Sequence, residues 1–141
     1  MTAEFSLPIR VYIEDTDAGG IVYYVNYLKY LERARTELMR TFGFERAAVS
    51  DAGWNFVVSD VSLSYHQPAR LDDQLHATAV ISGVGGATVS FRQTVRRDSA
   101  VLVSGEIQIA CVDRGTGSPT RLDADLRKQL EATLADTGKV T

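Results

Sequence analysis

Two carboxylates and two glycines stand close together near the N-terminus, in the segment from Asp15 to Gly20, which reads DTDAGG. A carboxylate can attack a carbonyl carbon directly or activate a water molecule that does so. Glycines, which have no side chain, let a ligand approach the backbone closely. A long stretch without glycine or proline follows, so we expect these carboxylates to stand just before a helix.

The start of a helix adds a second chemical feature to this segment. Its first N–H groups lack partners within the helix, and the helix dipole is positive there. Such groups can polarise a carbonyl oxygen and stabilise the oxyanion that forms in acyl transfer. A thioester suits this chemistry, because a thiolate leaves without a strong acid. The alternative is that Asp15 or Asp17 only caps the helix, as aspartate commonly does. Gly19 and Gly20 weigh against capping alone, because a cap does not require them.

The flanking sequence predicts the elements that hold this segment. Apolar and polar residues alternate from Phe5 to Ile13, which is the period of a half-buried strand, and Pro8 favours a sheet edge. After the segment, apolar residues recur every three or four positions from Ile21 to Phe42, and Gly43 ends the stretch. We therefore expect one long, deeply packed helix over residues 21–42.

Four more strands are predicted after this helix. Alternating apolar residues indicate strands at 54–65, 74–84, 87–97 and 101–111, and the short turns between the last three predict a meander. A short helix capped by Asp123 is expected at 123–135. With 141 residues, 45% of them apolar, the chain fits a single α+β domain over residues 1–141 whose antiparallel sheet curls around the long helix.

Charge and composition exclude several classes of protein. Fifteen Lys and Arg against 18 Asp and Glu give a net charge of −3, so we do not expect nucleic-acid binding. One cysteine and two histidines cannot supply a Cys/His zinc set, and we expect no metal or other cofactor. No run approaches the ~20 apolar residues of a membrane helix, and no secretory signal is visible. We expect no membrane span and a cytoplasmic location.

The string from Arg10 to Arg35, RVYIEDTDAGGIVYYVNYLKYLERAR, resembles the signature of the hotdog-fold acyl-CoA thioesterases. The similarity is to the 4-hydroxybenzoyl-CoA thioesterase-like branch with its Tol-Pal-associated (YbgC-type) members. It continues more weakly from Phe56 to Asp73 and through the last strand to Asp113. The resemblance implies a hotdog fold, a five-stranded antiparallel sheet wrapped around one long central helix. It also implies hydrolysis of a fatty or aromatic acyl-CoA, the substrate, to free acid and CoA.

Position by position, the resemblance assigns roles to several residues. It implies that Asp17 is the catalytic carboxylate, as nucleophile or general base, and that the backbone N–H of Tyr24 polarises the thioester carbonyl. Many YbgC-like members carry histidine where this chain has Tyr24, so a histidine-assisted mechanism is not expected. The positions that we expect to face the substrate are Gly20, Val22, Tyr23, Val58 and Ser59.

The part of the site that would hold the CoA nucleotide departs from the family pattern. Hydroxybenzoyl-type enzymes have basic residues at the turn after the third strand, whereas this chain has Gly83-Val84-Gly85-Gly86. Arginines elsewhere are candidate replacements, although charged side chains are mostly exposed whatever their function, which favours an ordinary surface charge for each. The candidates are Arg70, Arg92, Arg96 and Arg97.

Other residues carry simpler interpretations. Cys111 shares the apolar face of its strand, so we expect a buried, inert thiol. His66 and His76 are expected to have structural or solvent roles. Glu32 and Arg35, three apart on the helix, could form a surface ion pair or a subunit contact.

The last expectations concern the oligomeric state and the alternative functions. The resemblance implies a homodimer or homotetramer with active sites at the subunit interface. A dehydratase of the same fold is disfavoured, because its usual histidine is missing from the long helix. The remaining alternative is a non-catalytic acyl-CoA-binding or envelope-complex scaffold protein of the same fold.

Overall fold

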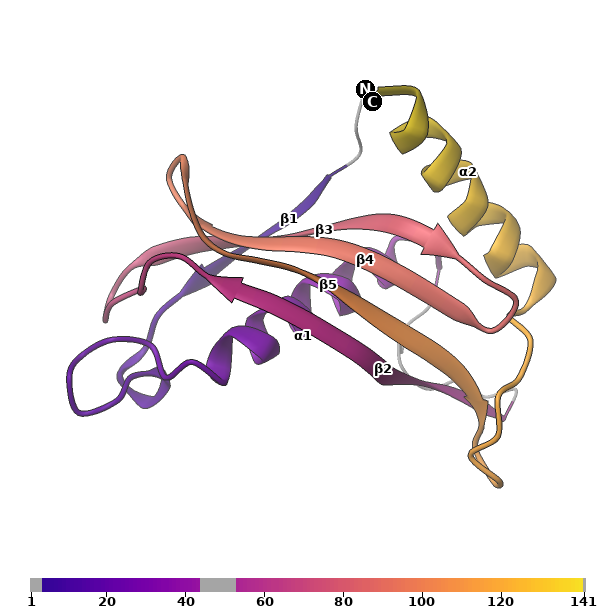
Figure 1. Cartoon of the computed structure of the whole chain (residues 1–141), viewed down its shortest axis with the longest axis horizontal. Helices are drawn as coiled ribbons and strands as arrows, with labels where there is room; N and C mark the ends of the chain where they lie inside the picture. The colour runs from indigo at the N-terminus through magenta and orange to yellow at the C-terminus, as the bar shows by residue number, and fades with distance from the viewer. Residues whose placement is uncertain (1–3, 44–52, 141) are drawn as a thin grey trace.

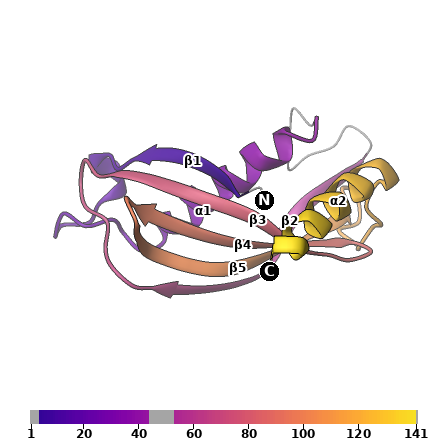
Figure 2. The same ribbon diagram turned by 90° about the horizontal axis from the view of Figure 1, so that it is seen from above.

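The computed structural model describes residues 4–43 and 53–140, with side chains as far as Leu134. Its five strands form one antiparallel sheet in the order β1-β3-β4-β5-β2 (Figures 1 and 2). Consecutive neighbours β3, β4 and β5 confirm the predicted meander, and β1 with its Pro8 lies at one edge. The strands are β1 (Phe5–Arg10), β2 (Trp54–Tyr65), β3 (Gln74–Val84), β4 (Thr88–Arg97) and β5 (Ala100–Asp113).

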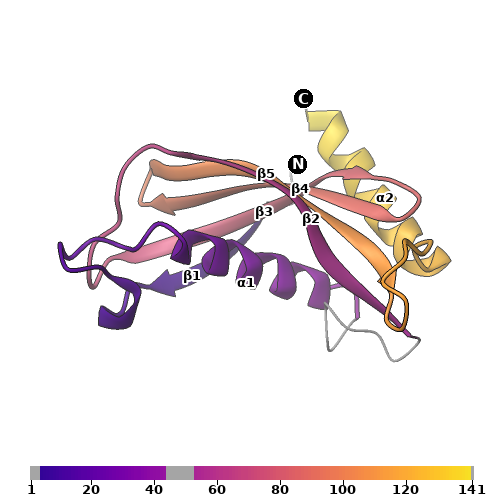
Figure 3. The same ribbon diagram turned by 60° about the horizontal axis from the view of Figure 1, so that its bottom comes forward.

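The principal helix, α1 (Asn26–Arg40), lies along one face of the sheet (Figure 3). It has 15 residues and begins five residues later than the helix predicted from Ile21. The early start was wrong because Val22 is held in extended backbone, where its N–H donates to the Ala69 carbonyl over 2.9 Å. A backbone N–H that donates to a distant segment is not available for the hydrogen bonds within a helix.

The first strand is also shorter than predicted. The backbone turns after Val11, and Ile13–Asp15 forms a single turn of 3₁₀ helix in place of the expected end of β1. The side chain of Asp15 stabilises this turn by accepting the N–H of Tyr12 over 2.9 Å. A local side-chain acceptor of this kind competes with strand pairing.

The C-terminal helix α2 (Ala124–Val140) contacts β3 at the end of the molecule farthest from residues 13–25 (Figure 1). Asp123 caps it, as predicted, by accepting the N–H of Leu126 over 3.2 Å. The expected length was wrong, because α2 has 17 residues and is longer than α1. Three leucines of this region are buried and anchor the helix: Leu122, Leu126 and Leu130.

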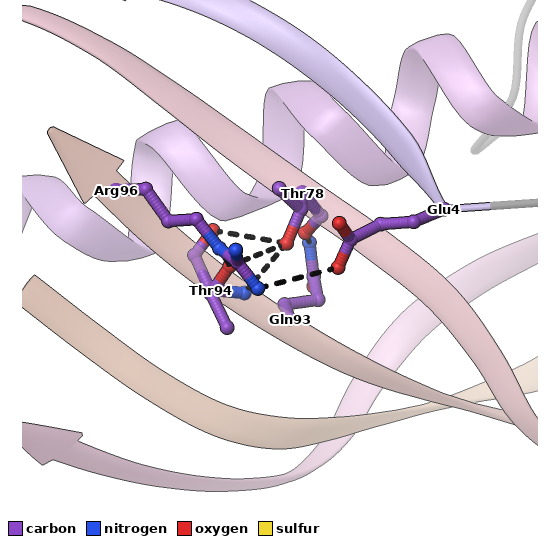
Figure 4. A network of polar contacts seen from close by, with 5 residues as sticks. All are labelled: Glu4, Thr78, Gln93, Thr94 and Arg96. Atoms are coloured by element: carbon purple, nitrogen blue, oxygen red, sulfur yellow. Dashed lines mark hydrogen bonds and ion pairs between the residues drawn. The ribbon is translucent and has the colours of Figure 1, made fainter. Parts of the chain in front are cut away.

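A buried polar side chain fixes α1 to the sheet. Gln93 of β4 is fully buried, and its Nε2 donates to the carbonyls of Leu31, in α1, and Thr78, in β3. The Thr78 hydroxyl lies 2.6 Å from that of Thr94, to which the Nε of Arg96 donates (Figure 4). Since buried polar groups are costly without partners, these contacts select one position of α1 over the sheet.

Candidate active site

The segment from Thr16 to Val22 folds into a tight hairpin. Thr16 pairs with Val22, and the N–H of Asp17 donates to the carbonyl of Ile21 over 2.9 Å. Gly20 adopts a φ of +80°, in the left-handed region that favours glycine. The turn itself therefore requires Gly20, and close approach of a ligand to the glycines stays a prediction.

Asp17 is exposed at the turn of this hairpin. Its Oδ1 accepts the N–H of Gly19 over 2.8 Å, and its Oδ2 has no hydrogen-bond partner among the described residues. Asp17 does not cap α1, because the N-cap position is Val25 and no side chain caps it. One carboxylate oxygen thus holds the turn, and the other remains free for a reacting group.

Asp15 has a different role, because its backbone carbonyl joins the residues before the hairpin to those after it. Its carbonyl accepts the backbone N–H of Tyr23 over 2.9 Å and the side-chain Nδ2 of Asn26 over 2.8 Å. Beneath it lies the phenol of Tyr30, whose pKa is raised by burial and by the Asp15 carboxylate. These contacts fasten the hairpin to the first turn of α1.

Free N–H groups lie just before α1, as the chemistry of a helix start requires. Tyr24 and Val25 have no acceptor for their backbone N–H groups within the described part of the chain. The next N–H, of Asn26, donates to the Tyr23 carbonyl over 2.8 Å. The Tyr24 N–H is therefore available to a substrate carbonyl.

A cavity of about 350 Å³ opens beside this helix start. The rings of Tyr24 and Tyr27 meet that of Tyr65, with centroids 6.2 and 5.7 Å away. Burial raises the pKa of Tyr27 and of Tyr65, so both phenols are neutral near pH 7. The three tyrosine rings give the cavity one aromatic wall, which suits an apolar group. The lining residues are Ile21, Val22, Tyr24, Tyr27, Tyr65, His66, Gln67 and Pro68.

One predicted substrate position, Val22, and the predicted catalytic position Tyr24 lie at this cavity. Tyr23 packs its ring 5.1 Å from that of Tyr24. Gly20 lies in the adjoining turn. Sequence reasoning missed Tyr65 as a cavity residue, although it belongs to the segment that carries the weaker family resemblance. His66 lies at the same cavity, and its expected structural or solvent role stays a prediction. His66 also bonds through Nε2 with the Ser104 hydroxyl over 2.8 Å.

Val58 and Ser59 lie elsewhere in the chain, in the middle of β2. Val58 lines two adjoining cavities of about 320 and 310 Å³ between α1 and β2, and Ser59 bonds to Gln108. Neither residue lines the cavity beside Tyr24. Within one protomer the structure does not bring these two predicted positions to Asp17.

The predicted surface ion pair between Glu32 and Arg35 is wrong. Arg35 is only 8% exposed, and its Nη1 donates to Oε1 of Gln93 over 3.0 Å. Burial lowers the pKa of its guanidinium, while the charge of Glu32 partly opposes that effect. Both side chains line the cavities between α1 and β2, so they remain candidates for a subunit contact.

The candidate basic residues divide into paired and unpaired groups. Arg97 pairs with Asp73 over 2.8 Å, and Arg96 lies 3.9 Å from Glu4 (Figure 4). Arg70 and Arg92 are exposed, and neither guanidinium makes a hydrogen bond or close ion pair with another described residue, although the charge of Arg70 helps to lower the pKa of Asp73.

Neither of the remaining candidates, Cys111 and His76, adds a catalytic or metal-binding site. Cys111 is buried as predicted, and burial raises the pKa of its thiol. His76 is exposed on β3. No group of three potential metal ligands occurs in residues 4–43 or 53–140, and neither described helix is long and apolar enough to cross a membrane.

Comparison with known proteins identifies the family of this chain. The model of the thioesterase-like superfamily matches residues 11–130. The acyl-CoA thioesterase YbgC of Haemophilus influenzae is 40% identical over 124 residues, covering 87% of this chain and 91% of that protein. The acyl-CoA thioester hydrolase YbgC of Escherichia coli is 41% identical over 113 residues, covering 79% and 84%.

Solved structures give the same result. A probable thioesterase from Bartonella henselae superposes with a TM-score of 0.77 at 33% identity, covering 86% of this chain and all of that one. A Staphylococcus aureus protein solved in complex with CoA shares the fold, with a TM-score of 0.87 at 12% identity and coverage of 96% and 86%. The family model, the sequence relatives and the shared fold together show that this chain belongs to the thioesterase-like superfamily, in its YbgC-type group.

Proposed function

We propose that this protein hydrolyses a fatty or aromatic acyl-CoA to the free acid and CoA, with Asp17 as the acting carboxylate. The observation that carries the proposal is that one loop, fastened by Asp15, holds both a carboxylate oxygen of Asp17 and the backbone N–H of Tyr24, and that neither group has a hydrogen-bond partner among the described residues. The names and identities of the relatives support the same reaction.

The reaction begins when the thioester carbonyl oxygen accepts the Tyr24 N–H. In one route Asp17 attacks the carbonyl carbon, the C–S bond breaks to release CoA thiolate, and water hydrolyses the resulting anhydride. In the other, Asp17 takes a proton from a water molecule that attacks the same carbon, and the C–S bond of the resulting tetrahedral intermediate breaks to release CoA thiolate and the acid. In both routes the N–H stabilises the oxyanion, and the aromatic cavity receives the acyl group.

Substitution of Asp17 tests this assignment. Asp17→Asn keeps the acceptor for the Gly19 N–H but removes the charge, so kcat for acyl-CoA hydrolysis should fall about 10²–10³-fold with the fold unchanged. The matched control is Asp125→Asn, which removes an exposed carboxylate on α2, at the opposite end of the molecule.

Two results would contradict the proposal. Wild-type turnover by Asp17→Asn would remove Asp17 from the mechanism. CoA binding by the wild-type protein without turnover of short-chain, long-chain or aromatic acyl-CoA would instead favour the non-catalytic binding protein.

We also propose that the protein assembles as a homodimer or homotetramer through α1 and β2. Among the residues that the structure describes, no strand lies beside the outer edge of β2, and its side chains Val57, Val58 and Val61 are 42–49% exposed. Exposed apolar residues beside an unpaired edge favour association. Contact here would allow Val58 and Ser59 of one protomer to approach the Asp17 site of its partner.

Light scattering of Val58→Asp tests this assembly, with the exposed α2 variant Gln129→Asp as control. The buried charge at position 58 should yield monomers with low activity. An unchanged assembly of Val58→Asp would refute an interface at β2.

A further inference from the structure

The hairpin that carries Asp17 is extended by a third short strand. Val22 donates its N–H to the Ala69 carbonyl, Ile21 forms a bridge with Arg70, and Leu71 donates to the Gly20 carbonyl over 3.3 Å. Residues 69–71 therefore lie directly beside residues 20–22, although some fifty residues of chain separate them.

This pairing places Asp17, Ile21 and Arg70 in one row. Asp17 lies opposite Ile21 within the hairpin, and Arg70 lies opposite Ile21 on the other side. Directly opposed residues of antiparallel strands project to the same face. Two steps of ~5 Å each separate the Cα atoms of Asp17 and Arg70. The side chain of Arg70 thus leaves the backbone on the face that carries Asp17, next to Ile21, which lines the aromatic cavity.

The guanidinium of Arg70 makes no hydrogen bond or close ion pair with a described residue, unlike its two cationic neighbours, although its charge helps to lower the pKa of Asp73. Arg97 donates to Asp73 over 2.8 Å and to the Pro68 carbonyl over 3.3 Å, and Arg10 donates to the Asp72 carbonyl over 2.7 Å. The backbone N–H of Arg70 donates to Asp73 and fixes the position of the residue. Its charge is therefore available for an external anion.

The proposed substrate supplies such an anion, because CoA carries a diphosphate and a further phosphate on its nucleotide. The net charge of −3 gives the chain no general attraction for this group, so binding depends on local cations. Arginine binds phosphate through two parallel hydrogen bonds. Arg92 is also unpaired, but it lies on β4 and takes no part in the hairpin.

We infer that Arg70 binds a phosphate group of the CoA part of the substrate while Asp17, in the same row, reaches its thioester. This inference rests on the proposed function. It deepens that function by assigning the nucleotide end of the substrate to the 69–71 strand, in place of the basic turn that the chain lacks.

Three thioesters of the same acyl group test the assignment. Their thiol part is CoA, 4′-phosphopantetheine or pantetheine. Arg70→Gln should raise KM for acyl-CoA about tenfold, the effect of losing one charge-assisted contact, while kcat stays the same. KM for the pantetheine thioester should not change, because it carries no phosphate. The phosphopantetheine thioester identifies which phosphate is bound. Arg70→Lys should restore part of the affinity, and Arg92→Gln should match the wild-type protein.

An unchanged KM for acyl-CoA in Arg70→Gln would overturn the inference, as would an equal rise for the pantetheine thioester. Calorimetric titration with free CoA separates this inference from the proposed function. A wild-type protein that hydrolyses none of the three thioesters, yet binds CoA more tightly than Arg70→Gln does, would contradict the hydrolase and support Arg70. Equal CoA affinity in both proteins would contradict Arg70.

Discussion

Arg35 and Gln93 meet in the interior of the protein, where Nη1 of the arginine donates to Oε1 of the glutamine over 3.0 Å. The same glutamine donates through Nε2 to the Leu31 carbonyl of α1 and the Thr78 carbonyl of β3. Gln93 carries no charge, but it therefore gives the buried guanidinium of Arg35 a hydrogen-bond acceptor. It also links α1 to the sheet.

Loss of this glutamine should destabilise the protein. Gln93→Leu leaves the buried guanidinium without its acceptor, and the free energy of unfolding should fall by about 3 kcal/mol. Urea denaturation measures the change, with Gln129→Leu on the exposed side of α2 as control. Equal midpoints for Gln93→Leu and wild type would mean that Arg35 finds another partner.

The contact between Asn26 and Asp15 should affect catalysis more than substrate binding. Asn26→Ala removes the hydrogen bond that fastens the Asp17 hairpin to the helix start, so kcat should fall about tenfold while KM changes little, because misplaced reacting groups lower the rate. Steady-state kinetics measures both constants. Asn55→Ala, at the start of β2, is the control. A rise in KM at constant kcat would indicate a binding role instead.

Gly105 should not tolerate a side chain. A Cβ there would overlap the Ser62 carbonyl and the Leu63 side chain of β2, so Gly105→Ala should cost about 1–3 kcal/mol and displace β2 from β5. Gly86→Ala is the matched control, because its Cβ would meet no atom within 4 Å. Denaturant unfolding compares the two variants, and equal stability would show that β2 moves without cost.

The ion pair of Asp73 and Arg97 should stabilise the folded protein, and this contribution should be lost at low pH. Burial opposes the effect, but the Arg70 N–H and the Arg97 guanidinium hold the pKa of Asp73 below its ordinary value of 3.8. A carboxyl whose pKa is lower in the folded state stabilises the protein above its unfolded pKa, and this contribution is lost as pH falls through the folded pKa. Asp73→Asn should therefore be less stable than wild type at pH 7, and the difference should shrink below pH 3.8. Thermal unfolding at several pH values across this range measures the difference in stability. A difference that does not change with pH would mean that Asp73 acts through packing and not through its charge.

Sequence alone determined much of the framework. Alternation of apolar residues predicted β2 and β3 with the bounds that the structure has, because side chains along a strand point alternately to its two faces. Burial itself alternates only at the start of β3, and β2 is largely exposed. The string around Asp17 also identified the family, and Asp123 marked the start of α2. These signals are local, so neighbouring residues suffice to express them.

Tertiary structure decided the details that depend on distant segments. Pairing with Ala69 and Arg70 removed Ile21 and Val22 from the helix, and burial against β4 gave Arg35 the partner Gln93 in place of Glu32. The same folding brought Tyr65 beside Tyr24 to form the cavity. Local periodicity states which face of an element is buried, but hydrogen bonds between segments far apart decide where elements begin and which side chains meet. The free N–H of Tyr24 and the row from Asp17 to Arg70 are of this second kind.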